Sequence, residues 1–234
     1  MADLSIIIPT YNEKDNLAPL AARIMDALGP RRIEPEILVI DDNSPDGTAG
    51  IAQGLAGQYP IRVIRRIDKK GLGSAILEGI RQAKAEVICV MDADLSHPPE
   101  ALPEMYKTIE NGAAQLVIGS RKAAGGGTSE WIWYRKVIHA VARGLGARLT
   151  PVKDITSGFF MFDRSIIENV KLEPRSWKIG LEIMVKGSYD KVLEHPIVFV
   201  ERAAGQSKMG IKEVLAYLSH LCSLAIYKMR TKRK

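Results

Sequence analysis

Two aspartates separated by one residue follow a strongly apolar stretch near the middle of the chain. Asp92 and Asp94 come directly after "VICVM" in the segment "VICVMDADLSHPPE" (87–100). In an extended chain, side chains two residues apart point to the same face, so the two carboxylates would lie side by side. Such a pair is repulsive unless a cation lies near it, and Mg²⁺ typically binds one or two carboxylates together with substrate phosphates. A divalent-cation site that serves a phosphate-bearing ligand is therefore one interpretation of this spacing, which by itself does not establish it.

An acidic loop that leads into a helix is the alternative interpretation of the same residues. In that case Ser96 would be the N-cap and Pro98 would stand near the first helical turn. The choice between the two depends on what the rest of the fold places around Asp92 and Asp94.

Short β-branched stretches alternate with helical patterns through the first half of the chain. Strands are predicted at 4–9, 36–41, 61–66, 86–92 and 115–121, with helices at 16–28, 48–56, 73–84 and after Pro98. This alternation is typical of βαβ units around a mostly parallel sheet, in which ligands bind beyond the carboxyl ends of the strands. Four of these strands run into polar segments, namely "PTYNE", "DDNSPDGT", "DADLS" and "GSR". Their convergence at one edge of the sheet favours the metal site over a simple acidic loop.

The second half of the chain is expected to add smaller elements to this α/β domain. A glycine-rich loop (123–130) precedes a predicted helix at 131–149, and 154–163 is predicted as an edge strand or hairpin arm. A last strand is predicted at 195–202, and an amphipathic helix at 211–230. We therefore expect one catalytic-type domain over 1–210, followed by a C-terminal amphipathic helix and basic tail over 211–234.

Composition excludes several classes of protein. The chain has 234 residues, 46% of them hydrophobic and 26% charged, and its positive charges exceed its negative charges by 33 − 27 = 6. Five positive charges stand in the last seven residues, "KMRTKRK", so the excess predicts no nucleic-acid partner. Cys89 and Cys222 are expected to be buried thiols in a reducing compartment. The segment 4–8 is too short for a signal peptide, and no run reaches the roughly 18 apolar residues of a membrane span.

Seven motifs, taken together, carry a resemblance to a known family. They are "IIIPTYNE", "VIDDNSPDGT", "KGLGSAILEGI", "MDADLSHPP", "GSR", "DITSGFFMF" and "RAAGQSK", in this order from Ile6 to about Lys208. The chain resembles the family-2 glycosyltransferases of the GT-A fold, and more narrowly the dolichyl-phosphate (polyprenyl-phosphate) mannose synthases. The resemblance implies a Rossmann-like three-layer α/β fold with a mostly parallel central sheet.

The resemblance also implies residues for a nucleotide sugar. Asp41 or Asp42 would accept hydrogen bonds from base or ribose, although Asp42 could instead belong to a turn or helix cap. Asp46, Gly47 and Thr48 fit that turn role better. The full set implied for the nucleotide sugar is Pro9, Tyr11, Glu13, Asp41, Asp42, Lys70, Gly71, Asp92, Ala93, Asp94, Arg202 and Lys208.

The metal and the acceptor phosphate follow from the same resemblance. Mg²⁺ or Mn²⁺ would bind Asp92, Asp94 and Ser96, the last at a position where some relatives have Gln. The acceptor phosphate would contact Arg121, Arg135 and Ser157. The residues expected to carry catalysis are Asp92, Asp94, Arg121 and Arg202. His97, next to the acidic pair, is more readily a bystander than a catalytic base.

The implied reaction is an inverting transfer of mannose from GDP-mannose to dolichyl phosphate. A phosphate monoester has a second pKa of about 6, so the acceptor is already a dianion and needs no general base. A peripheral position at the cytoplasmic face of a membrane is expected, through the C-terminal helix or a membrane-anchoring subunit.

Three alternatives remain open at the level of the sequence. A UDP-glucose-dependent polyprenyl-phosphate glucosyltransferase would use the same motifs, and a non-catalytic nucleotide-sugar-binding module could keep them. A sugar-phosphate nucleotidyltransferase would need a glycine-rich loop with Arg directly after the first strand, where "PTYNE" stands instead.

Overall fold

A central β-sheet organises the molecule. The computed structural model describes residues 2–68, 71–128, 149–173, 178–200 and 211–231, with the side chains of the last segment described from Ser219 onward. Within these residues the sheet has seven strands in the order β3-β2-β1-β4-β7-β5-β8. All neighbouring pairs are parallel except those of β7, which is antiparallel to both β4 and β5. The strands are β1 (Leu4–Thr10), β2 (Pro35–Asp41), β3 (Ile61–Arg65), β4 (Val87–Val90), β5 (Leu116–Ser120), β7 (Phe160–Asp163) and β8 (Val192–Pro196).

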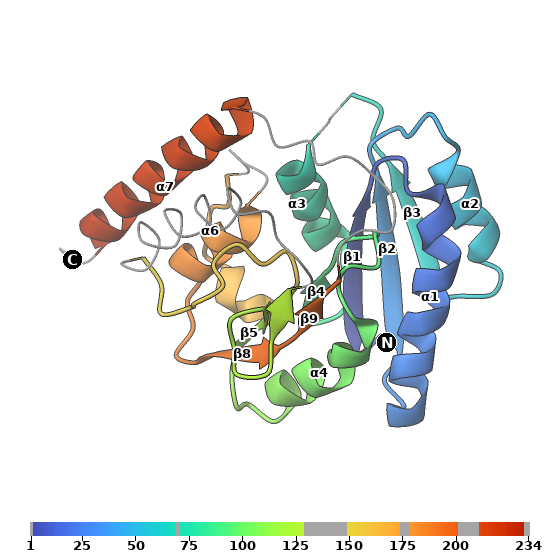
Figure 1. The fold of residues 1–234 in the computed structure, drawn as a ribbon, viewed down its shortest axis with the longest axis horizontal. Coiled ribbons are helices and arrows are strands. Elements are labelled where there is room, and N and C mark those ends of the chain that lie inside the picture. Colours follow the sequence, from blue (N-terminus) through green and yellow to red (C-terminus); the bar gives the residue numbers. More distant parts are fainter. Residues whose placement is uncertain (1, 69–70, 129–148, 174–177, 201–210, 232–234) are drawn as a thin grey trace.

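Helices cover both faces of this sheet and make three layers (Figure 1). On one face lie α1 (Lys14–Leu28), α2 (Thr48–Leu55) and α4 (Leu102–Glu110). On the other face lie α3 (Leu72–Gln82), α6 (Ile179–Lys186) and α7 (Ile211–Thr231). Three short 3₁₀ helices (Gly29–Arg31, Pro99–Ala101, Arg164–Ile167) and a small sheet of β6 (Gly127–Thr128) with β9 (Val198–Phe199) complete the described elements. The predicted α/β class and three-layer plan are confirmed.

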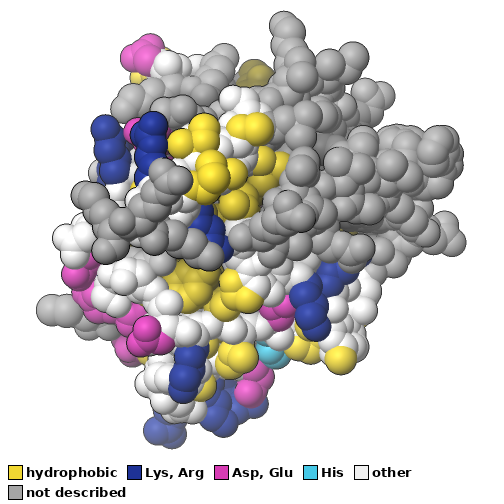
Figure 2. Space-filling view, turned by 90° about the vertical axis from the view of Figure 1, so that its left-hand side faces the viewer, with side chains coloured by type: hydrophobic (Ala, Val, Ile, Leu, Met, Phe, Trp, Pro, Cys, Tyr) yellow, Lys and Arg dark blue, Asp and Glu magenta, His cyan; other side chains and the backbone are white. Residues whose placement is uncertain are grey.

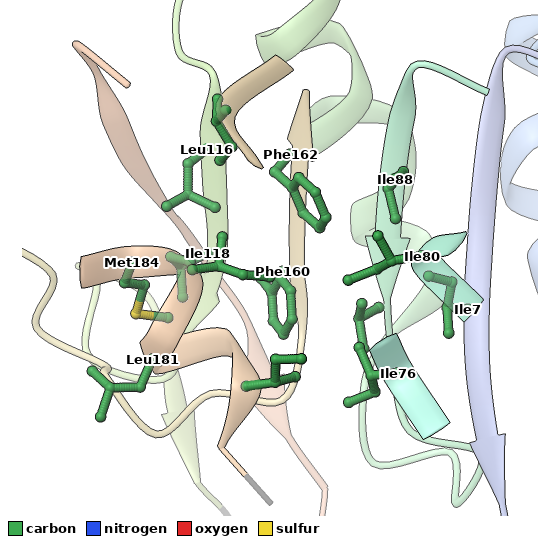
Figure 3. Packing of buried hydrophobic residues seen from close by; sticks show 14 of the residues in the cluster. Ile7, Ile76, Ile80, Ile88, Leu116, Ile118, Phe160, Phe162, Leu181 and Met184 are labelled. Atoms are coloured by element: carbon green, nitrogen blue, oxygen red, sulfur yellow. The ribbon is translucent and has the colours of Figure 1, made fainter. Parts of the chain in front are cut away.

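The strand β7 lies inside the sheet, and here the prediction of an edge strand or hairpin arm was wrong. Phe160 and Phe162 point to the face of α3 and α6, whereas Phe159 and Met161 belong to the core of the opposite face. Figure 3 shows Phe160 and Phe162 between residues of β5 and α6 on one side and Ile76, Ile80 and Ile88 on the other. A strand that is apolar on both faces is buried on both faces, so "FFMF" belongs in the interior of a sheet.

Other boundaries also differ from the sequence-based expectation. A last strand was predicted at 195–202, and the described part of this range, 195–200, contributes to two short strands of different sheets, β8 and β9. The helix α6 was not predicted, and most of the helix predicted at 131–149 lies outside the described residues. Cys89 is buried as expected, but Cys222 is exposed, because it lies on the side of α7 that faces away from the core.

The C-terminal helix α7 packs against α6 through a polar cluster as well as apolar contacts. Leu221 and Leu224 join the core. Beside them the buried Glu182 accepts hydrogen bonds from Lys186 Nζ (2.6 Å) and from the Glu173 backbone N–H (2.9 Å). Nε2 of the buried His220 lies 3.8 Å from the second oxygen of Glu182. The described part of α7 is therefore docked on the domain, while a domain boundary at residue 210 stays a prediction.

Candidate active site

The strand order places a switch point between β1 and β4, where the loops that follow the two strands run in opposite directions at the carboxyl edge of the sheet. From β1 the chain passes to β2 and β3 on one side, and then returns to β4 on the other side of β1 (Figure 1). In doubly wound sheets ligands bind at such a switch point, beyond the carboxyl ends of the two strands. The segment 11–13 follows β1 and the segment 91–97 follows β4, so both lie at this edge.

The two aspartates differ in exposure. The Asp92 side chain is 32% exposed, whereas Asp94 is 9% exposed and Ala93 between them packs into the core. Asp94 Oδ1 accepts hydrogen bonds from the backbone N–H of Ser96 (3.1 Å) and from its hydroxyl. Leu95 connects them with a left-handed backbone (φ 61°), which is rare for a bulky residue. The loop thus leaves the Asp92 carboxylate partly exposed, whereas Ser96 holds the Asp94 carboxylate in place.

Ser96 does not cap the following helix, contrary to the alternative interpretation of this loop. The 3₁₀ turn starts at Pro99, its N-cap is Pro98, and no side chain caps it. The Ser96 hydroxyl is bound to Asp94 instead. Ser96 therefore acts on the acidic pair through Asp94, and its predicted place among the metal ligands stays a prediction.

A buried ion pair lies close to the acidic pair. Arg121 Nε and Nη2 donate to the two oxygens of Asp154 at 2.8 and 2.7 Å, and the Arg121 backbone N–H donates to the same carboxylate at 3.0 Å. The side chains of Arg121 and Asp154 are 8% and 1% exposed. Burial raises the pKa of Asp154, but the hydrogen bonds and the charge of Arg121 outweigh this and bring that pKa below its ordinary value. Glu194 of β8 supports the pair, since it accepts from the Asp154 backbone N–H (3.0 Å).

Lys178 is a residue that the sequence analysis missed. Its buried ammonium donates to the backbone carbonyl of Thr156. Burial, with the nearby charge of Arg121, lowers the pKa of Lys178 to about 7, while the charges of Asp92 and Asp154 act in the opposite direction. The basic side chains of Lys178 and Arg121 thus lie near Asp92. No pattern in the sequence pointed to Lys178, because it precedes an unpredicted helix and approaches Asp92 only through the fold.

Asp41 and Asp42 have partners within the protein. Asp41 is fully buried and accepts from Thr10 Oγ1 (3.2 Å) and the Ser44 backbone N–H (2.9 Å). Asp42 accepts from Arg66 Nε (2.6 Å) and from the Gly71 backbone N–H (2.8 Å). In this structure Asp41 closes a local turn to Ser44, whereas Asp42 binds residues that lie 24 and 29 positions away and forms neither a turn nor a helix cap. The contacts of both aspartates with base or ribose stay a prediction. The turn role predicted for Asp46 is confirmed, since its carboxylate accepts from the Thr48 backbone N–H (3.0 Å).

The remaining predicted residues divide into three groups. Tyr11 is 41% exposed and Glu13 is half-buried, so both are accessible beside β1, whereas Pro9 is buried within that strand. The Ser157 hydroxyl donates to the backbone carbonyl of Gly119 (2.6 Å) and so ties the segment before β7 to β5, and its contact with the acceptor phosphate stays a prediction. Outside the described residues lie Lys70, Arg135, Arg202 and Lys208.

Gly158, two residues before β7, leaves the space into which Asp92 and His97 fit. A Cβ at this position would lie 3.2 Å from Asp92 Oδ2 and 3.3 Å from His97 Cε1. We expect Gly158→Ala to displace the Asp92 carboxylate by a few tenths of an ångström. A misplacement of about 1 Å can cost about a hundredfold in rate, so we expect about a tenfold loss of turnover.

The measurement is kcat for Gly158→Ala against Gly50→Ala as the control. Gly50 lies on the exposed side of α2, where a Cβ would meet nothing within 4 Å. Equal turnover of both variants would contradict the steric role of Gly158.

The fold and this edge define a class of protein. A doubly wound α/β domain with an acidic pair at its switch point, and buried Arg and Lys side chains beside it, has the arrangement of a ligand-binding site beyond the strand ends. The chain belongs to glycosyl transferase family 2, whose sequence model matches residues 5–171. It is therefore a glycosyltransferase, and the resemblance drawn from the seven motifs is confirmed.

Similar proteins cover most of the chain. A dolichol-phosphate mannosyltransferase of Pyrococcus furiosus is 45% identical over 225 residues, which are 94% of this chain and 63% of that relative. The chain thus spans less than two thirds of that protein's length. A dolichol-phosphate mannosyltransferase of Saccharomyces cerevisiae is 35% identical over 97% of this chain and 88% of its own length.

Solved structures support the fold. Glucosyl-3-phosphoglycerate synthase from Mycobacterium tuberculosis, in complex with Mn²⁺, UDP and glucosyl-3-phosphoglycerate, matches 97% of this chain and 80% of its own with a TM-score of 0.65. Mannosyl-3-phosphoglycerate synthase from Rubrobacter xylanophilus matches 99% of this chain and 75% of its own, with a TM-score of 0.64. At 18% and 16% sequence identity these likenesses concern the GT-A fold alone.

Proposed function

We propose that this glycosyltransferase moves mannose from GDP-mannose to dolichyl or another polyprenyl phosphate, with inversion at the anomeric carbon. Relatives named dolichol-phosphate mannosyltransferase, which match 94% and 97% of the chain, support a product of the dolichyl phosphate mannose type. The observation that carries the proposal is the placement of the partly exposed Asp92 near the buried basic side chains of Lys178 and Arg121. A carboxylate and basic side chains at one edge suit a reaction between two phosphate-bearing substrates.

The acidic pair fits a divalent cation that is shared with a substrate. Among the described residues, no three His, Cys, Asp or Glu side chains cluster so that they could hold a metal by themselves. A pair of carboxylates such as Asp92 and Asp94 is sufficient for Mg²⁺, which usually binds one or two protein carboxylates together with substrate phosphates. Bound there, Mg²⁺ or Mn²⁺ would neutralise charge that develops on the leaving diphosphate. Mn²⁺ occurs with UDP in the glucosyl-3-phosphoglycerate synthase complex of the same fold.

The burial of His97 supports an acceptor that needs no general base, such as a phosphate. Its ring is 3% exposed, and burial lowers its pKa although Asp92 and Asp94 act to raise it. A side chain enclosed in this way is poorly placed to take a proton from an acceptor hydroxyl. An acceptor phosphate is already a dianion above its second pKa of about 6, so the proposed reaction needs no such base.

The exposed side of α7 supports a peripheral position at a membrane, which we place at the cytoplasmic face. Ile226, Tyr227 and Met229 are exposed there, and Lys228 and Arg230 stand in the same last turns. Figure 2, viewed from the side on which α7 ends, shows hydrophobic side chains next to Lys and Arg. Apolar and basic side chains together suit an interface with anionic lipid or with a membrane-anchoring subunit. Within the described parts of the chain, no helix has the length and apolar character that crossing a bilayer requires.

The donor and acceptor are tested by incubating the protein with Mn²⁺, dolichyl phosphate and radiolabelled GDP-mannose or UDP-glucose, and extracting the lipid. We expect label in the lipid from GDP-mannose only. Label from UDP-glucose alone would replace the donor assignment by a glucosyl transfer. Binding of GDP without label transfer from either donor would point to a binding module instead.

A further inference from the structure

We propose that His97 is a positioning residue that fixes the backbone of Asp92 and thereby aims its carboxylate at the cation and the donor diphosphate. The proposal rests on the metal role assigned above to Asp92 and Asp94. It gives a function to a histidine that the reaction does not otherwise use.

One ring nitrogen of His97 is committed to the backbone of Asp92. The Asp92 N–H donates to Nδ1 of His97 at 3.0 Å. A nitrogen that accepts a hydrogen bond carries no proton, so the neutral ring has its proton on Nε2. Nε2 lies 3.8 Å from Asp92 Oδ2. This distance is longer than a hydrogen bond, but it places the Nε2–H on the side of that carboxylate oxygen.

Aromatic packing fixes the orientation of the ring. His97 stacks on Phe159 with centroids 5.3 Å apart and an interplanar angle of 16°, and Phe199 meets it edge-on at 5.6 Å and 65°. Gly158 lies against its Cε1 edge. The phenylalanines come from the buried segment before β7 and from β9, so two distant parts of the chain hold one imidazole.

The loop that His97 closes needs such support. Leu95 adopts φ 61° between the two ends of the Asp92–His97 hydrogen bond. A left-handed conformation at a residue other than glycine is strained and persists only where surrounding contacts hold it. The hydrogen bond across the loop, and that from the Val200 N–H to the Ser96 carbonyl (3.4 Å), supply these contacts. Without the imidazole acceptor, the Asp92 backbone would lose its partner at the point where the carboxylate must be aimed.

Three variants separate the role of each ring nitrogen. In His97→Asn the amide oxygen stands near the position of Nδ1 and can accept from the Asp92 N–H. In His97→Gln the amide stands near the position of Nε2, and His97→Leu keeps the volume without either polar group. Loss of a partner that orients a metal ligand typically weakens metal binding about 10- to 100-fold, and we expect this for Leu and Gln, with Asn close to wild type.

Metal binding is measured directly, and not only through activity. Mn²⁺ is titrated into the protein with GDP or, separately, UDP present, and free Mn²⁺ is followed by electron paramagnetic resonance. The Mn²⁺ concentration for half-maximal transfer is measured beside kcat. The control is His195→Asn, a partly buried histidine of β8 outside this site, which should leave the Mn²⁺ affinity unchanged.

The ring itself gives a readout that does not depend on the reaction. Two-bond ¹H–¹⁵N correlation spectra of the wild-type protein should show His97 with its proton on Nε2. A proton on Nδ1, or equal Mn²⁺ affinities of wild type and all three variants, would overturn the positioning role, as would Asn binding as weakly as Leu. If mannose transfer fails while Mn²⁺ binding still depends on His97, the proposed donor or acceptor is wrong and the positioning role stands.

Discussion

Replacement of Asp92 by Asn is expected to lower the rate of sugar transfer about a hundredfold to a thousandfold, the cost typical of losing one group that stabilises transition-state charge. The Asp92 carboxylate is the more exposed of the acidic pair and faces the edge at which the substrates are proposed to bind. Asn keeps the size of the side chain but loses the negative charge that a divalent cation requires. The measurement is kcat at saturating donor and acceptor, with Mn²⁺ varied to separate weaker metal binding from slower turnover.

A matched substitution on the surface controls for the loss of one negative charge. Asp26 is exposed on α1, and Asp26→Asn should transfer sugar at the wild-type rate. Asp94→Ala should also lose most activity, because Asp94 is held by Ser96 in the same loop. Undiminished transfer in either Asp92→Asn or Asp94→Ala would remove the metal from the proposed mechanism.

Replacement of Asp154 by Ala is expected to lower the free energy of unfolding by about 3–5 kcal/mol, the usual cost of leaving one member of a buried ion pair without its partner. Arg121 is nearly enclosed and donates three hydrogen bonds to this carboxylate. Urea denaturation followed by circular dichroism measures the change.

The exposed pair Arg23–Glu100 is a close geometric control. Arg23 also donates two hydrogen bonds to the Glu100 carboxylate, at 3.0 and 2.8 Å, but the side chains are 39% and 59% exposed. Solvent screens such a pair, and Glu100→Ala should therefore cost less than about 1 kcal/mol. Equal losses in the two variants would show that burial does not set the strength of the Arg121–Asp154 pair.

Lowering the pH is expected to reduce the free energy of unfolding of the wild type more than that of an Asp154→Asn variant. The pKa of Asp154 is lowered in the folded protein from its ordinary value of 3.8. The stabilisation from this group is therefore fully present above pH 3.8, and it is lost as the pH falls through the lower pKa of the folded state. As the pH falls below 3.8, the denaturation curves of wild type and Asp154→Asn should converge. A difference in stability that stays constant with pH would contradict the assigned pKa shift.

The local signals of the sequence were enough for the class of fold and for the acidic pair. Each strand of the first half was predicted within a few residues, because buried parallel strands are continuous apolar runs and the helices between them have apolar residues at helical spacing. Asp92 and Asp94 stood out because two carboxylates at one strand end are unusual in any fold. These features depend on residues that are neighbours in the chain.

The sheet order and the partners of the polar side chains followed from long-range packing. β7 inserts between β4 and β5 although it follows both in the sequence, and its insertion brings Gly158 against Asp92 and Phe159 against His97. Arg121 meets Asp154 across 33 residues of chain, and Asp42 meets Gly71 across 29. A charged side chain has many potential partners in a sequence, and burial selects among them, because each buried charge must be paired where the strands place it. The acidic pair could therefore be recognised from the amino-acid sequence. The residues that position the Asp92 carboxylate could not, because they come together only through the order of the strands in the sheet.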